Sequence, residues 1–210
     1  MPGAARNLFP TSDHERIKVG QHIQEVEGLR PGAVRRTVLR GAQLAGLDRY
    51  LARAPLKSVR VSGELRDDGG HFTGDHIRGS IRISARRVQG EDYGIPFKWG
   101  EVATVATSAT TPEQAMQRTF VHELGHYLLY RLMEQAGREA VEALIKPVFR
   151  EAVDVGRTVS ERAEENWREY FCETFSASVY HHRELTSRDL AGYRMVQQAR
   201  ALLEVDHGDS

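Results

Sequence analysis

Two histidines and a glutamate stand close together in the 210-residue chain, as His122-Glu123-Leu124-Gly125-His126. On a helix, residues four apart lie on one face, so both imidazoles can approach the same metal ion. Glu123 is turned by roughly 100° around such a helix and can reach a water molecule on that ion. The spacing therefore predicts zinc (Zn2+) as cofactor, His122 and His126 as ligands, and Glu123 as general base of a metal-assisted hydrolysis.

A third protein ligand must come from further along the chain, because catalytic zinc usually has three. The extended motif with a third histidine is absent, since the six residues after His126 contain none. Glu169 and Glu173 are candidates, because they are four apart in a stretch that reads as a buried helix, where a carboxylate needs a partner or a metal. The other nearby glutamates lie among arginines and read as solvated: Glu161, Glu164 and Glu165.

The segment Asn166-Trp167-Arg168-Glu169-Tyr170-Phe171-Cys172-Glu173-Thr174-Phe175, taken with HELGH at 122–126, resembles the catalytic domain of anthrax lethal factor and related gluzincin-type metallopeptidases. The likeness covers these fifteen motif residues and, loosely, the stretch 57–181. The resemblance implies that Glu169 is the third zinc ligand. It also implies that Glu173 is a supporting carboxylate, and we expect it to orient one ligand histidine through the free ring N–H.

One position departs from this family. The family has a tyrosine seven residues before the ligand glutamate, where its hydroxyl assists the transition state, and Arg162 stands there instead. Either a donor placed elsewhere substitutes for the tyrosine, or catalytic power is reduced. Whether residue 162 faces the zinc site depends on how early the later helix begins.

The elements that would carry these residues follow from the apolar spacing. Proline, glycine and capping residues mark the ends of the helical stretches. Helices are expected at 31–53, at 112–136 with Thr111 as N-cap and Gly137 as stop, at 138–153 with a kink or interruption near Pro147, and at 160–181. Alternating apolar residues predict strands at about 57–66 and 78–86, and a third short strand at 102–106.

The resulting fold expectation is α+β and zincin-like, with a small twisted β-sheet over the HExxH helix and the glutamate-bearing helix beneath. Residues 1–29 are polar and weakly periodic, so we expect a poorly structured or loosely docked segment there and a metallopeptidase domain at 30–210. The strand near Ile81 to Ser84 could be the sheet edge where an extended substrate adds as a further strand. A helix-interior glycine costs about 1 kcal/mol relative to alanine, which indicates that something passes close to Gly125.

Other residues that could do chemistry have simpler interpretations. His181 and His182 fall at an expected helix end and read as surface histidines. His71, Asp75 and His76 could bind a metal, but the segment between two strands favours a polar turn. The single cysteine, Cys172, has no nucleophilic setting and is expected to pack as a small hydrophobic residue.

Composition sets the outer limits. The chain has no net charge, but residues 1–60 carry eleven Lys/Arg against five Asp/Glu. These arginines are spread among apolar residues without aromatic stacking partners, which favours a solvated helix face over nucleic-acid binding. One cysteine excludes an internal disulfide, and no apolar run is long enough for a membrane span. The cytoplasm is the default location, with export by a route that needs no signal peptide left open.

The sequence therefore predicts a zinc-dependent endopeptidase with a protein or peptide as substrate. Two alternatives remain open. One is a non-catalytic binding or structural module with the zincin fold, such as a phage-particle or regulatory protein, which the basic N-terminal third and Arg162 would suit. The other is an intracellular regulatory peptidase that cleaves a repressor. The cleavage specificity and the oligomeric state cannot be read from the sequence.

Overall fold

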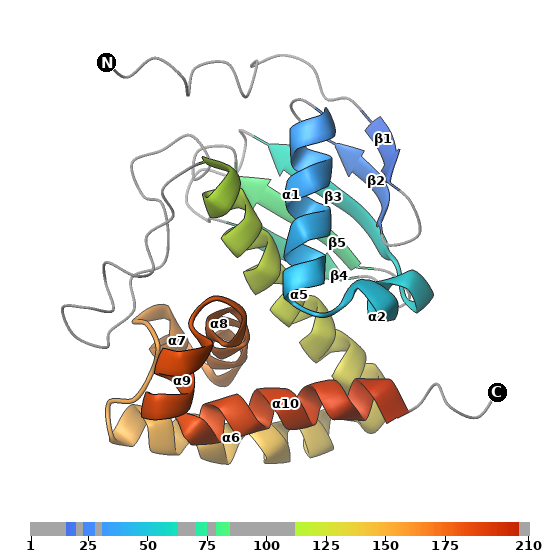
Figure 1. Cartoon of the computed structure of the whole chain (residues 1–210). Helices are drawn as coiled ribbons and strands as arrows, with labels where there is room; N and C mark the ends of the chain where they lie inside the picture. Colours follow the sequence, from blue (N-terminus) through green and yellow to red (C-terminus); the bar gives the residue numbers. More distant parts are fainter. Residues whose placement is uncertain are drawn as a thin grey trace, which may run out of the picture. The chain divides into compact units, whose positions relative to one another are not determined.

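The computed structural model describes residues 16–19, 23–27, 31–62, 70–74, 79–84 and 112–205 of the chain. These residues form helices and one β-sheet, which confirms the α+β expectation (Figure 1). The chain divides into two compact units, Met1–Gly94 with Ala109–Glu123 and Ile95–Ser108 with Leu124–Ser210. The boundary falls inside helix α5 (Pro112–Ala136), so the residues on both sides of it belong to one continuous helix.

The sheet of the first unit is mixed. Its strands are β1 (Arg16–Val19), β2 (Ile23–Glu27), β3 (Leu56–Ser62), β4 (Gly70–Gly74) and β5 (Gly79–Ser84). They lie in the order β1-β2-β3-β5-β4, with β2, β3 and β5 parallel and both outer pairs antiparallel. β3 and β5 confirm the two predicted strands, whereas the third, at 102–106, lies outside the described residues.

The apolar face of the sheet follows the alternation in the sequence. Val59 and Val61 on β3 lie opposite Ile81 and Ile83 on β5, and all four are fully buried. Helix α1 (Pro31–Leu44) contacts β1 and β2 and lies across the sheet in Figure 1. This sheet therefore has one core face, because every second side chain of a strand points to the same face and these alternate residues are apolar.

Two of the sequence expectations for this unit need correction. The predicted helix 31–53 is two helices, α1 and α2 (Asp48–Arg53), because Gly46 takes a positive φ of 66° that ends the first one. The segment from His71 was expected to be a polar turn, but residues 70–74 form strand β4. Glycines at both ends of β4 masked the strand pattern, while pairing with β5 provides its hydrogen bonds.

The position of β4 also changes the predicted substrate edge. β5 is paired with β3 on one side and with β4 on the other, so the strand near Ile81 to Ser84 is not a sheet edge. Strands β1 and β2 lie inside the segment 1–29, which was expected to be poorly structured or loosely docked. Parallel pairing of β2 with β3 holds that part of the segment in the sheet. The domain boundary near residue 30 stays a prediction.

The second unit is helical. After α5 it contains α6 (Arg138–Asp154), α7 (Arg162–Glu165), α8 (Trp167–Tyr180), α9 (His182–Arg188) and α10 (Leu190–Val205). The bounds of α5 agree with the prediction, and Gly137 follows it with a φ of 83°. Helix α6 continues through the exposed Pro147, so of the predicted kink or interruption the interruption is wrong. The predicted helix 160–181 is broken at Asn166 into α7 and α8.

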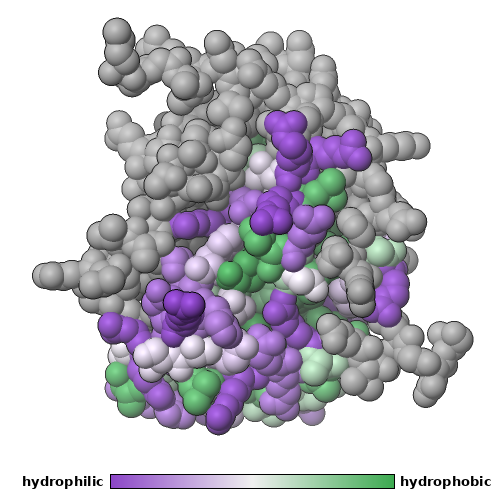
Figure 2. All heavy atoms as spheres, in the orientation of Figure 1, coloured by the Kyte–Doolittle hydropathy of each residue, from purple (hydrophilic) through white to green (hydrophobic). Residues whose placement is uncertain are grey.

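Helix α8 is the inner helix of this unit, in contact with α6, α7, α9 and α10. Its aromatic residues Tyr170, Phe171 and Phe175 are buried, and the rings of Phe171 and Phe175 are stacked at a centroid separation of 6.5 Å. In Figure 2 hydrophilic and apolar residues are mixed over α10, where Leu190 and Leu202 are exposed singly. No helix in the described ranges is both long and apolar enough to cross a membrane.

A polar contact is buried in this helical core. The Tyr170 hydroxyl donates a 2.6 Å hydrogen bond to Asp189, which is fully buried and also accepts from the backbone N–H of Gly192 at 3.0 Å. Asp189 thereby caps the start of α10. A Cβ at position 192 would collide with the Asp189 carboxylate and the Tyr170 hydroxyl, so this cap requires glycine. Burial, and then the charge of Asp189, raise the pKa of Tyr170.

Removing this hydroxyl should destabilise the fold. Tyr170→Phe leaves one Asp189 oxygen without its donor, which should cost about 1–3 kcal/mol at neutral pH. The half-buried Tyr193 provides the control Tyr193→Phe, which leaves the Asp189 cap intact. Free energies of unfolding from urea titrations give the measurement, and equal losses in both variants would contradict the assignment.

The same pair should show a pH dependence. Above about pH 10 a tyrosine in the unfolded chain ionises, whereas burial keeps Tyr170 protonated in the folded chain. The unfolded state then binds fewer protons, so the stabilising contribution of Tyr170 is lost as the pH rises. The stability difference between wild type and Tyr170→Phe should therefore shrink between about pH 9 and pH 11.

Candidate metal centre

Helix α5 carries the two histidines on one face. His122 and Glu123 are buried, with 3% and 1% exposure, and the His126 side chain is 18% exposed. One helical turn separates the histidines, as the four-residue spacing requires. Apolar residues on either side hold this part of the helix in place: Met116, Phe120, Leu124 and Leu128 are buried. The histidine pair is thus fixed on a rigid element.

Glu169 is placed by the way α8 begins. Asn166 has extended backbone angles, and its side chain accepts hydrogen bonds from the N–H groups of Arg168 at 3.0 Å and Glu169 at 3.1 Å. An asparagine at this N-cap position satisfies amides that the helix leaves without partners. Glu169 therefore lies in the first turn of α8, where the helix dipole also favours a carboxylate.

A close helix contact brings these elements together. A Cβ on Gly125 would lie 3.0 Å from the Cys172 Cα and 3.3 Å from its Cβ and Sγ. Because glycine has no Cβ, the α8 backbone can approach α5 this closely, whereas any larger residue would press on the Cys172 backbone. Gly125 adjoins His126, and Cys172 follows Glu169 by three residues, so the contact sets the separation of these ligands. The prediction that something passes close to Gly125 is confirmed, and Cys172 is buried as expected.

The three predicted ligands are brought together. His122, His126 and Glu169 each offer an atom within 4.8 Å of the others, and no other such group occurs in the described residues. The His126 Nε2 lies 3.2 Å from Glu169 Oε1. Two ligand atoms about 2.1 Å from one tetrahedral ion would be about 3.4 Å apart, so this pair has a suitable separation. Two imidazoles and a carboxylate could therefore hold a metal ion here.

Arg162 also faces this group. Its Nε donates a 2.8 Å hydrogen bond to Glu169 Oε2, the oxygen that does not face His126. The carboxylate thus lies between His126 on α5 and Arg162 on α7. Residue 162 does point toward the predicted ligands, although the helix that carries it is a separate short one. The sequence marked Arg162 only as a departure from the family pattern, and nothing in its spacing predicted the contact with Glu169.

Glu173 is buried, with 2% exposure, and accepts a 3.1 Å hydrogen bond from the Ser160 hydroxyl. Ser160 in turn accepts from the backbone N–H of Ala163 at 3.1 Å. Glu173 thus secures the start of α7, a role that sequence reasoning missed. A serine three residues before an alanine is common in loops, so this pattern did not predict the contact of Ser160 with Glu173. The expected contact of Glu173 with a ligand histidine stays a prediction.

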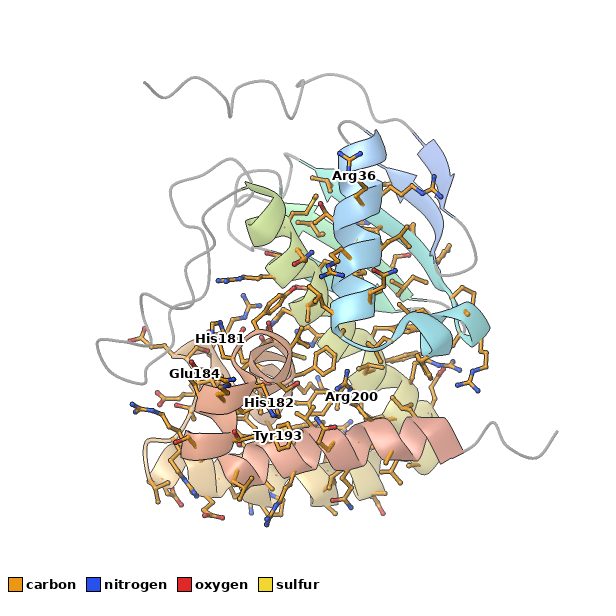
Figure 3. The ribbon with its side chains drawn as sticks, viewed as in Figure 1. Arg36, His181, His182, Glu184, Tyr193 and Arg200 are labelled. Carbon is orange, nitrogen blue, oxygen red and sulfur yellow. The ribbon has the colours of Figure 1, made fainter. Side chains whose placement is uncertain are left out.

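The remaining candidates lie apart from this group. His181 ends α8 and is buried, contrary to the surface position expected, whereas His182 is exposed at the start of α9. Figure 3 shows His182 beside Tyr193 of α10, with their rings edge to face at 4.9 Å. Asp75 and His76 lie outside the described residues. Among the nearby glutamates, Glu161 and Glu165 are exposed as expected, and Glu164 accepts a hydrogen bond from Thr158 at 2.8 Å.

Comparisons with known proteins add no family to this geometry. No protein-family model matches the chain, and neither a curated protein nor a solved structure shows significant similarity to it. The interpretation of the site therefore depends on its own residues.

Alanine at position 125 should disturb this site. The new methyl group would meet the Cys172 backbone, which cannot rotate away, so overpacking of about 1–3 kcal/mol should exceed the roughly 1 kcal/mol gained in helix propensity. We expect lower stability and weaker metal binding, measured by urea unfolding and zinc titration. Gly137→Ala, where a Cβ would meet nothing within 4 Å and only the positive φ of 83° is strained, is the control and should lower stability but leave metal affinity unchanged.

Proposed function

We propose that this protein is a zinc-dependent peptidase that hydrolyses peptide bonds in a protein or peptide substrate. The observation that carries the proposal is the group His122, His126 and Glu169, with the buried Glu123 on the same helix. Two histidines and a carboxylate are also used by non-haem iron sites. The glutamate beside the first histidine favours zinc, because hydrolytic zinc sites of this spacing need a base.

The residues of the chain have separate tasks in this proposal. His122, His126 and Glu169 would hold the ion, and a bound zinc would polarise the scissile carbonyl and lower the pKa of water. Glu123 accepts the proton of the attacking water and delivers it to the leaving amine. Glu123 is 1% exposed, so its carboxylate has little contact with bulk solvent. The zincin-like interpretation of the fold belongs to the same proposal.

A specific observation supports a second candidate, a non-catalytic metal-binding module. Arg162 occupies the position of the family's tyrosine, and its guanidinium is engaged with Glu169. A residue held in this way is a poor substitute for a hydroxyl aimed at the transition state. Under this alternative the chain binds zinc but does not cleave peptides. A regulatory peptidase that cleaves a repressor would share the zinc-dependent hydrolysis of the first candidate and differ only in its substrate.

Zinc should bind with a stoichiometry of one per chain. Glu169→Ala should weaken affinity by more than the roughly 10–100-fold that loss of a supporting contact costs, because a direct ligand is removed. Glu165→Ala removes an exposed glutamate from the preceding short helix and serves as the control. Elemental analysis and competition with a chromogenic chelator measure both quantities. A folded wild type without zinc uptake at micromolar metal would contradict the proposal.

Glu123→Gln should separate catalysis from metal binding. The amide is nearly isosteric but cannot accept the proton, so turnover of a peptide library should fall by roughly 10²–10⁴-fold while zinc stays bound. The control is Glu134→Gln, an exposed position on the same helix. Cleavage by the wild type that Glu123→Gln leaves intact would rule out Glu123 as the base. A zinc-loaded wild type that cleaves nothing would favour the non-catalytic module.

A further inference from the structure

The second oxygen of Glu169 has a partner of its own. Oε1 faces His126 Nε2 at 3.2 Å, and Oε2 accepts from Arg162 Nε at 2.8 Å. The Arg162 and Glu169 side chains are 28% and 14% exposed, so both are largely shielded from solvent. A charge-assisted hydrogen bond in such surroundings is stronger and more directional than one between neutral groups at the surface.

Arg162 is itself held in place by α8. Glu173 accepts from Ser160 at 3.1 Å, and Ser160 accepts from the Ala163 backbone at 3.1 Å. Ala163 is fully buried and adjoins Arg162. The start of the short helix α7 is therefore secured to α8 by two contacts: through Ser160 to Glu173, and through Arg162 to Glu169. These two glutamates are one turn apart on the same helix.

We propose that Arg162 is a positioning residue that keeps Glu169 a single-oxygen ligand of the metal. Carboxylates bind metal ions through one oxygen or through both. With Oε2 held by Arg162, only Oε1 is presented beside His126, and the ion keeps a coordination position for a molecule that is not protein. This inference depends on the proposed metal site. It adds a role for the residue that departs from the family pattern.

The Arg162 guanidinium also affects how well the ligands are organised before a metal ion binds. Glu169 is a flexible side chain near the helix start, and a contact with Arg162 restricts it to one orientation. Contacts of this kind to ligand residues typically change metal affinity by about 10–100-fold. Loss of Arg162 should therefore weaken binding and should also let the second oxygen of Glu169 reach the metal. These two effects have different readouts.

The experiment uses the full chain loaded with Co2+ in place of zinc. Cobalt visible absorption weakens when the ion changes from four to five ligands, so it reports the coordination number directly. Arg162→Met should bind Co2+ about tenfold or more weakly and show weaker absorption per bound ion. Arg162→Lys, which keeps one charged donor, should recover part of both. A merely structural loss of stability would leave the spectrum of the bound ion unchanged.

Arg168→Met is the matched control. Arg168 precedes Glu169 directly, but its guanidinium lies over the Trp167 ring at 5.2 Å. This substitution removes the same charge from the same region. Because Arg168 contacts Trp167 and not the Glu169 carboxylate, its loss should leave the spectrum unchanged. Ser160→Ala provides a second test, because it loosens α7 without touching Glu169. It should shift affinity in the direction of Arg162→Met, by a smaller factor, and it keeps the inference testable if Arg162→Met does not fold.

The outcomes separate this inference from the proposed function. A wild type that binds neither Co2+ nor zinc overturns the metal site and this inference together. A wild type that binds Co2+, with an identical spectrum and affinity in Arg162→Met and Ser160→Ala, overturns the role of Arg162 alone. An equal change in Arg168→Met also overturns it, because general charge would then explain the effect. A change confined to Arg162 and Ser160 variants supports it.

Discussion

The close approach of α5 and α8 at Gly125 and Cys172 is the constraint on which the site depends. A side chain at position 125 would lie 3.0 Å from the Cys172 backbone, so the distance between these helices is set by the absence of a Cβ. Gly125 is next to the predicted ligand His126, and Cys172 is about one turn from the predicted ligand Glu169. A rigid contact of this kind fixes ligand spacing more accurately than a loop could, and metal sites tolerate errors of only a few tenths of an ångström.

The break at Asn166 serves the same site. A single helix over 160–181 would place α7 and α8 on one axis, whereas the extended backbone of Asn166 sets them at an angle. This break gives α8 a new first turn that contains Glu169, and it lets Arg162 from α7 return to the same carboxylate. A residue with a short polar side chain can do this because it replaces the hydrogen bonds that helix continuation would have provided.

Helix α8 buries the polar groups of Tyr170 and Glu173, and the contact that each makes holds a neighbouring element. Glu173 holds the start of α7 through Ser160, and Tyr170 holds the start of α10 through Asp189. Buried polar groups of this kind contribute little net stability when paired but are costly when one partner is lost. They specify one arrangement of the helices around α8. The predicted ligand Glu169 lies on this same helix, so its position depends on these contacts.

The sequence by itself determined the four-residue histidine spacing, the bounds of α5 and the two central strands, and it narrowed the third ligand to Glu169 or Glu173. These depend on local periodicity, capping residues and a motif whose members are close in the chain, so short-range physics suffices to predict them. Only the tertiary structure decided that β4 shields β5 from the sheet edge, that Glu173 contacts Ser160, and that Arg162 holds the second oxygen of Glu169. Those outcomes depend on which partners long-range packing brings within hydrogen-bonding distance. A charged or hydroxylated side chain has several possible partners in the sequence, and only the packed fold selects among them.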